Sequence, residues 1–137
     1  MSRTAQCSCG QLSVTVEGDP ELVVLCNCTE CQRRTGSAFG IGAYFKHERV
    51  TDISGEQTIF QRSSDSGRQA EAHFCSVCGT TVYWQLEMWP DRYGMAVGCF
   101  ADPNFPQPRA SVWSATKHEW VRTPEDCREF EDQGSRA

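Results

Sequence analysis

Cysteine is the residue that most constrains how this chain can fold. Nine cysteines occur among 137 residues, and seven of them lie in three short groups. The groups are Cys7-Ser8-Cys9-Gly10, Cys26-Asn27-Cys28-Thr29-Glu30-Cys31 and Cys75-Ser76-Val77-Cys78-Gly79. Such close spacing lets neighbouring sulfurs reach one metal ion. We therefore expect each group to fold into a loop or hairpin that brings its thiolates together.

The expected compartment favours metal binding over disulfides. The segment from Met1 to Cys7 has no apolar stretch typical of a secretory signal, and no run is long and apolar enough to cross a bilayer. We expect a cytoplasmic protein, whose reducing surroundings keep thiols free or metal-bound. The odd number of cysteines also argues against a complete disulfide framework.

The charge of the chain excludes two classes of partner. Its net charge is −5 and its pI about 5.1, with only 13 lysines and arginines spread along the sequence. A nucleic-acid-binding protein presents a basic patch, and so does a protein that binds an anionic membrane surface. We expect neither nucleic acid nor membrane as a partner. An oligomer is compatible with the sequence, but nothing in it indicates one.

Short alternating segments predict an all-β domain. In residues 11–17, Leu12, Val14 and Val16 lie on one face of a half-buried strand. Turn residues separate this segment from similar ones, and we expect further strands at 22–25, 39–45, 58–62, 69–74, 80–86, 93–100 and 112–113. Aromatic side chains usually form the core of small β domains, so we expect this of Phe39, Phe45, Trp84, Trp113 and Trp120.

Helical periodicity is scarce. We expect one turn after Cys31 and a short helix from Pro124, which Thr123 can cap. The length indicates one domain over residues 1–137, with a core from about residue 3 to residue 124 and an acidic tail at 125–137. We expect the chain after Phe130 to be frayed.

Counting ligands suggests how the cysteines divide. Residues two apart in an extended segment point to the same side, and the glycine of a C-x-x-C-G turn permits a tight bend. The outer pairs supply four thiolates, as a closed structural site requires, and the middle group supplies three and leaves one position open. Spacing alone also allows Cys78 or Cys99 to complete the middle site. All-sulfur ligation indicates zinc or an iron–sulfur centre, and the uneven spacing favours zinc.

The order of these motifs resembles a known family. The chain has C-x-C-G, then C-x-C-x-x-C followed by basic residues and Gly36-Ser37, and then C-x-x-C-G. This order is similar to that of the glutathione-dependent formaldehyde-activating enzyme family, whose domain is shared with centromere protein V. The resemblance runs from Cys7 to about Trp120. It implies a β-tent fold similar to Mss4-like domains, made of twisted antiparallel sheets. It also implies two zinc ions, a structural one at Cys7, Cys9, Cys75 and Cys78 and a catalytic one at Cys26, Cys28 and Cys31.

The resemblance also implies an activity. The implied enzyme is a carbon–sulfur lyase similar to S-(hydroxymethyl)glutathione synthase. In such an enzyme a small thiol such as glutathione binds at the open zinc and adds to formaldehyde. We expect Arg33 or Arg34 to bind a substrate carboxylate, and the amides of Gly36 and Ser37 to receive a developing oxyanion. Family members often carry His and Arg where this chain has Asn27 and Gln32, so its substrate need not be the family's namesake.

A second interpretation is a non-catalytic, zinc-stabilised binding module with two structural metal sites. It predicts a complete second site, whereas an enzyme needs an exchangeable position inside a pocket. His73, two residues before Cys75, is either an outer partner of the metal site or an ordinary strand histidine. We expect Cys99 to be a small buried side chain and Cys127 to be an incidental thiol.

Overall fold

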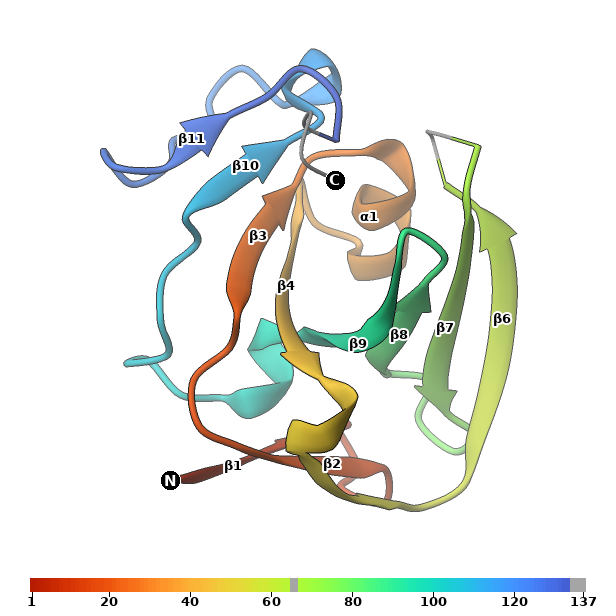
Figure 1. The fold of residues 1–137 in the computed structure, drawn as a ribbon. Helices are drawn as coiled ribbons and strands as arrows, with labels where there is room; N and C mark the ends of the chain where they lie inside the picture. Colours follow the sequence, from red (N-terminus) through yellow and green to blue (C-terminus); the bar gives the residue numbers. More distant parts are fainter. Residues whose placement is uncertain (65–66, 134–137) are drawn as a thin grey trace.

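Two β-sheets form the fold, which a computed structural model describes for residues 1–64 and 67–133 (Figure 1). The smaller sheet has three strands in the order β1-β2-β5, which are Ser2–Gln6, Ser13–Glu17 and Val50–Ser54. The larger sheet has eight strands in the order β11-β10-β3-β4-β9-β8-β7-β6. In chain order these are Leu22–Cys26 (β3), Gly40–Lys46 (β4), Gln57–Ser63 (β6), Gln69–Cys75 (β7), Thr81–Leu86 (β8), Trp89–Ala96 (β9), Ala110–Val112 (β10) and Arg128–Glu129 (β11).

The expected all-β class is confirmed. Most strand pairs are antiparallel, whereas β10 runs parallel to both β3 and β11. In the described ranges the single α-helix is α1, Thr29–Thr35, and the other helical segments are 3-10 turns at His47–Arg49, Val97–Phe100 and Ser114–Thr116. No helix in the described part of the chain has the length and apolar character needed to span a membrane.

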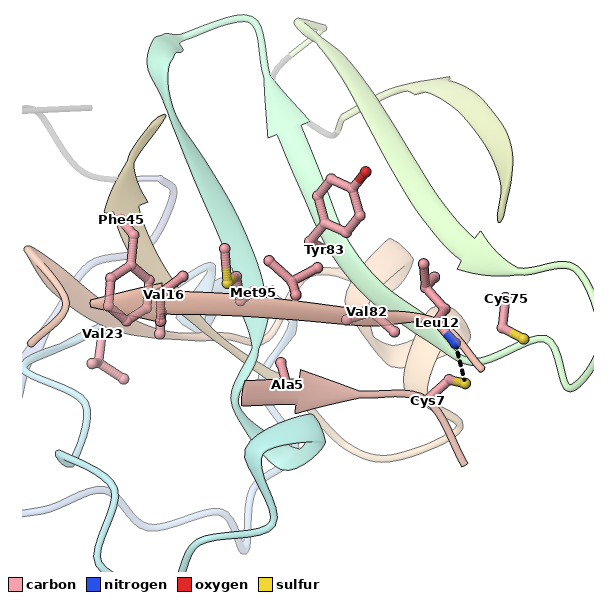
Figure 2. Packing of buried hydrophobic residues seen from close by; sticks show 12 residues of the cluster. Ala5, Cys7, Leu12, Val16, Val23, Phe45, Cys75, Val82, Tyr83 and Met95 are labelled. Atoms are coloured by element: carbon pink, nitrogen blue, oxygen red, sulfur yellow. Dashed lines mark hydrogen bonds between the residues drawn. The ribbon is translucent and has the colours of Figure 1, made fainter. Parts of the chain in front are cut away.

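One face of the large sheet packs against the small sheet and forms the main core (Figure 2). Phe45 and Met95 of the large sheet meet Leu12, Val14 and Val16, and all five side chains are fully buried. Burying a side chain of this size contributes about 1.5–3 kcal/mol to folding. The apolar face expected for residues 11–17 therefore forms the part of this core that comes from the small sheet.

The other face of the large sheet carries a second apolar cluster around Val24, Tyr44 and Trp84. Two glycines make room for its largest side chain. An ideal Cβ on Gly42 of β4 would lie 2.6 Å from Trp84 Cζ2, and one on Gly94 of β9 would lie 2.1 Å from Trp84 Nε1. The indole therefore lies directly against the strand backbones, where its Nε1–H donates to the Tyr44 hydroxyl over 3.1 Å.

The structure corrects one strand boundary. The strand expected at 93–100 begins earlier, at Trp89, and ends at Ala96, after which Val97–Phe100 forms a 3-10 turn. The turn lets the Phe100 ring stack on Phe105 at 4.6 Å between ring centroids, so aromatic packing ends the strand. Strands β1 and β5 were not predicted, because their sequences carry too few apolar residues to alternate clearly.

The expected C-terminal helix is also wrong. The chain forms β11 instead, where Arg128 N donates to Arg109 O over 3.0 Å and Phe130 N donates to Ser111 O over 2.9 Å. Pairing with β10 satisfies these backbone groups better than a short isolated helix does. Nor is the chain frayed directly after Phe130, since Trp113 N donates to Asp132 O over 2.8 Å. The remainder of the expected frayed segment, residues 134–137, lies outside the described residues.

The close approach of Trp84 to Gly94 gives the first prediction. We expect Gly94→Ala to displace the indole and lower the free energy of unfolding by about 1–3 kcal/mol, as overpacking does. Urea unfolding followed by circular dichroism measures this loss. Gly98→Ala is the matched control, because its Cβ would meet no atom within 4 Å. We expect the control to change stability by less than about 0.5 kcal/mol, and equal losses in both variants would contradict the packing argument.

Candidate functional site

The outer cysteine pairs come together at the junction of the two sheets. Cys7 and Cys9 follow β1, Cys75 ends β7 and Cys78 lies in the turn before β8. All four sulfurs lie within 4.8 Å of one another, with 3.7 Å from Cys9 Sγ to both Cys7 Sγ and Cys75 Sγ. This four-cysteine cluster ties the N-terminal hairpin to the β7–β8 hairpin, segments far apart in the sequence.

Hydrogen bonds to these sulfurs fit a metal-bound thiolate. The Leu12 amide donates to Cys7 Sγ over 3.2 Å, and the Val77 amide donates to Cys75 Sγ over 3.3 Å. Hydrogen bonds from the side chain and backbone of Thr80 lower the pKa of Cys78 to about 5. Donors of this kind stabilise the charged sulfur that binds a metal, so the cluster fits a structural zinc ion.

The middle cysteines also come together, at the start of α1. Cys26 ends β3, and Cys28 caps α1 by accepting from the Cys31 amide over 3.3 Å. The three sulfurs lie within 4.8 Å of one another. Between them, Asn27 is fully buried and donates its Nδ2 to Ser111 Oγ over 3.0 Å. Local sequence thus brings the sulfurs together, and Asn27 fixes their loop to β10.

Within residues 1–64 and 67–133, the three-cysteine cluster has no fourth protein ligand. In the described part of the chain, no further His, Cys, Asp or Glu places a ligand atom within the same distance of all three sulfurs. Cys78 belongs to the four-cysteine cluster. Cys99 instead lies 3.7 Å from the Thr81 carbonyl, and burial raises its pKa to about 11. The donor set fits a zinc ion with three thiolates and one open position.

The charges around this cluster are uneven. Hydrogen bonds with Cys26 and then with Cys28 lower the pKa of Cys31 to about 3, and the positive charges of Arg34 and Arg62 lower it further. Hydrogen bonds with Cys28 and then with Cys31 raise the pKa of Cys26. Of these two thiols, Cys31 therefore ionises more readily and Cys26 keeps its proton, so the negative charge at Cys31 lies near two arginines.

A cavity opens beside the three-cysteine cluster, on the face of the large sheet opposite the main core. Its lining includes the three cysteines together with Arg34, Arg62, Tyr44 and Trp84. Its walls come from alternate residues of β3, β4, β7, β8 and β10, since alternate residues share one face of a strand. The open side of the cluster thus faces a space that a small molecule can enter.

The structure brings only one of the four expected substrate-binding residues to this cavity. Arg34 lines it, with its guanidinium carbon 4.5 Å from the centre of the Trp84 ring. Arg33 has 74% of its side chain exposed and contacts Glu30 at 3.5 Å. The Gly36 amide donates to Gln32 O over 2.8 Å to cap α1, and the Ser37 amide donates to Thr35 Oγ1 over 3.0 Å. Neither Gly36 nor Ser37 lines the cavity.

Several cavity residues were missed from the sequence. Trp84 is buried in the second apolar cluster, as expected, and also lines the cavity. Trp113 lines the cavity, and Trp120 is 67% exposed. The Gly40-x-Gly42 alternation was a usable signal, because glycines on one strand face leave space beside it. The sequence did not indicate that Arg62 lies near the site, because it belongs to the edge strand β6, far in sequence from Cys26, Cys28 and Cys31.

His73 is not placed against the metal ligands by any described contact. Its Nδ1 lies 2.6 Å from Gln57 Oε1, and its Nε2 lies 3.1 Å from Glu71 Oε1. Two other side chains do reach the cysteines. Gln11 Nε2 donates to Cys75 Sγ over 3.0 Å, and Thr80 Oγ1 lies 3.3 Å from Cys78 Sγ. The outer partners of the four-cysteine cluster therefore come from the β1–β2 hairpin and the β7–β8 turn rather than from His73.

Together, the β-sheets and the cysteine-bearing loops define a β protein with two cysteine clusters of the kind that can hold a metal ion, one of them beside a cavity. Residues 2–116 match the family described as glutathione-dependent formaldehyde-activating enzyme, and the chain belongs to this family. Its fold is similar to that in the crystal structure of a Rhodobacter sphaeroides protein. The TM-score is 0.56 and the identity 22%, over 93% of this chain and 98% of that chain. At this identity the similarity concerns the fold alone.

The two clusters should differ in their effect on stability. We expect Cys9→Ser to remove one zinc ion and lower the free energy of unfolding by at least about 3 kcal/mol, because that cluster joins two distant hairpins. Cys31→Ser should remove one zinc ion with a smaller loss. Metal analysis and urea unfolding of both variants measure this. Equal losses of stability would contradict the division of roles.

Proposed function

We propose that the chain is a zinc-dependent carbon–sulfur lyase-type enzyme that makes or cleaves the hydroxymethyl adduct of a small thiol, such as S-hydroxymethylglutathione. The observation that supports it is the three-cysteine cluster with an open side facing a cavity. A binding module with two structural sites would need a complete second ligand set. Membership of the formaldehyde-activating family favours the same conclusion.

Cys26, Cys28 and Cys31 would hold the catalytic zinc ion, and the four-cysteine cluster would hold the structural one. A bound zinc ion lowers the pKa of a thiol that coordinates it, which is the chemistry it would supply. Arg34, stacked on Trp84, places a positive charge near Cys31 and so favours the anionic form of an incoming thiol. The apolar walls exclude water from the reacting groups.

In the proposed reaction the thiol sulfur forms a bond to the formaldehyde carbon. The π electrons of the carbonyl move to its oxygen, which takes up the proton released by the thiol and becomes the hydroxyl of the adduct. Cleavage is the reverse. Each direction needs a proton donor or acceptor at that oxygen.

We assign Tyr44 as the group that donates a proton to that oxygen and takes it back in the reverse reaction. Tyr44 lines the cavity, its hydroxyl accepts from Trp84 Nε1, and no described contact takes the hydroxyl proton. Burial raises the pKa of Tyr44, so the hydroxyl stays protonated at neutral pH and able to donate. This role replaces the one expected for the Gly36 and Ser37 amides, which donate within α1 and the loop after it.

Exchange NMR of the thiol–formaldehyde equilibrium tests the activity. The zinc-loaded protein should speed exchange between free thiol and hydroxymethyl adduct above the spontaneous rate, and Cys31→Ser should abolish the increase. The Cys127→Ser variant is the control, since this thiol belongs to neither cluster. Failure to accelerate exchange with any of several thiols would overturn the proposed function.

Tyr44→Phe tests the proton donor. We expect it to lower the catalysed exchange rate by about 100-fold, a typical contribution of a positioned acid. Thiol binding should be unchanged, because the ring keeps its edge contact with Trp89 at 4.7 Å between centroids. Tyr93→Phe, which alters a tyrosine packed against the main core, is the control. If the Tyr44→Phe variant keeps the full catalysed exchange rate, Tyr44 is not the proton donor.

A further inference from the structure

Most of the cavity wall is apolar. Beyond Trp84 and Tyr44, its lining includes Leu22, Leu86, Trp89, Trp113 and Phe130. Among the described residues of the lining there is no Asp or Glu. Glutathione has two carboxylates, an ammonium group and two peptide groups. The described part of the cavity lining therefore offers that ammonium group no carboxylate.

Three arginines, Arg34, Arg62 and Arg68, also line the cavity. None of them takes part in an ion pair within the described ranges. Arg62 is the most informative, because its Nη1 is buried and has no hydrogen-bond partner. A buried guanidinium nitrogen without an acceptor is unfavourable, so its presence points to a ligand that supplies one.

The thiolates account for part of this positive charge but not all of it. A zinc ion with three thiolates has a net charge of −1, and a fourth thiolate from the substrate makes it −2. Two of the three guanidinium groups balance that charge. A third guanidinium therefore remains for another anionic group on the substrate.

We infer that the cavity binds a thiol, or its hydroxymethyl adduct, with an apolar body, one carboxylate and no ammonium group, and that Arg62 binds the carboxylate. This inference rests on the proposed function for the thiol part of the substrate. The apolar body packs against the tryptophans, and the carboxylate accepts from the unpaired Nη1 of Arg62. Glutathione is then a poor substrate compared with such a thiol.

An isosteric series of ligands without sulfur tests the anion site independently of catalysis. The probes are 3-phenylpropanoate, 3-phenylpropanol and 3-phenylpropylamine, titrated into the zinc-loaded protein. Tryptophan fluorescence reports binding, because three of the four tryptophans, Trp84, Trp89 and Trp113, line the cavity. We expect the carboxylate to bind about tenfold more tightly than the alcohol, and the amine to bind most weakly.

Matched variants assign the preference to one residue. Arg62→Gln should abolish the advantage of the carboxylate over the alcohol, and Arg62→Lys should restore part of it. Arg33→Gln removes a charge that lies outside the cavity, and it should leave the advantage intact. Circular dichroism checks that the variants fold. Equal binding of acid and alcohol, or an unchanged preference in Arg62→Gln, would overturn the inference.

Exchange NMR with two thiols separates this inference from the proposed function. Faster catalysed exchange for 2-benzyl-3-sulfanylpropanoate than for glutathione supports both. Acceleration for glutathione alone leaves the proposed function standing and overturns the inferred substrate class. If neither thiol is accelerated but phenylpropanoate binding depends on Arg62, the proposed function fails and the anion site at Arg62 is upheld.

Discussion

The junction of Cys7 and Cys9 with Cys75 and Cys78 is the constraint on which the rest of the structure depends. Their sulfurs lie within 4.8 Å of one another, so the hairpin at the start of the chain is held beside the β7–β8 hairpin. This contact places the small sheet over one face of the large sheet, where the main core forms. The opposite face of the large sheet is then left to form the cavity.

The two faces of the large sheet differ because their side chains differ in size. On the core face, Phe45 and Met95 fill the space against the small sheet. On the cavity face, Gly40, Gly42 and Gly94 leave space that Trp84 and the Arg34 guanidinium occupy only in part. Small residues on one face and large ones on the other allow the same strands to support both a packed core and an open site.

The site could be predicted to the extent that it is local. Cys26, Cys28 and Cys31 lie within one short segment, and a β-strand followed by a helical turn is enough to bring their sulfurs together. Arg33 and Arg34 show the limit of this reasoning. Successive helical residues point about 100° apart, so only one of the two can face the cavity, and their sequence does not say which. The packing of α1 beside Trp84 selects Arg34.

The sequence by itself determined the all-β class, most of the strands and the three short groups of metal-binding cysteines, because alternation and ligand spacing are properties of short segments. Only the tertiary structure decided that Trp84 lines a cavity as well as packing in an apolar cluster, that Tyr44 and Arg62 line the same cavity, and that residues 128–129 form a strand. These outcomes depend on which strands become neighbours. Pairing between distant strands is set by the free energy of the whole fold and leaves no local pattern.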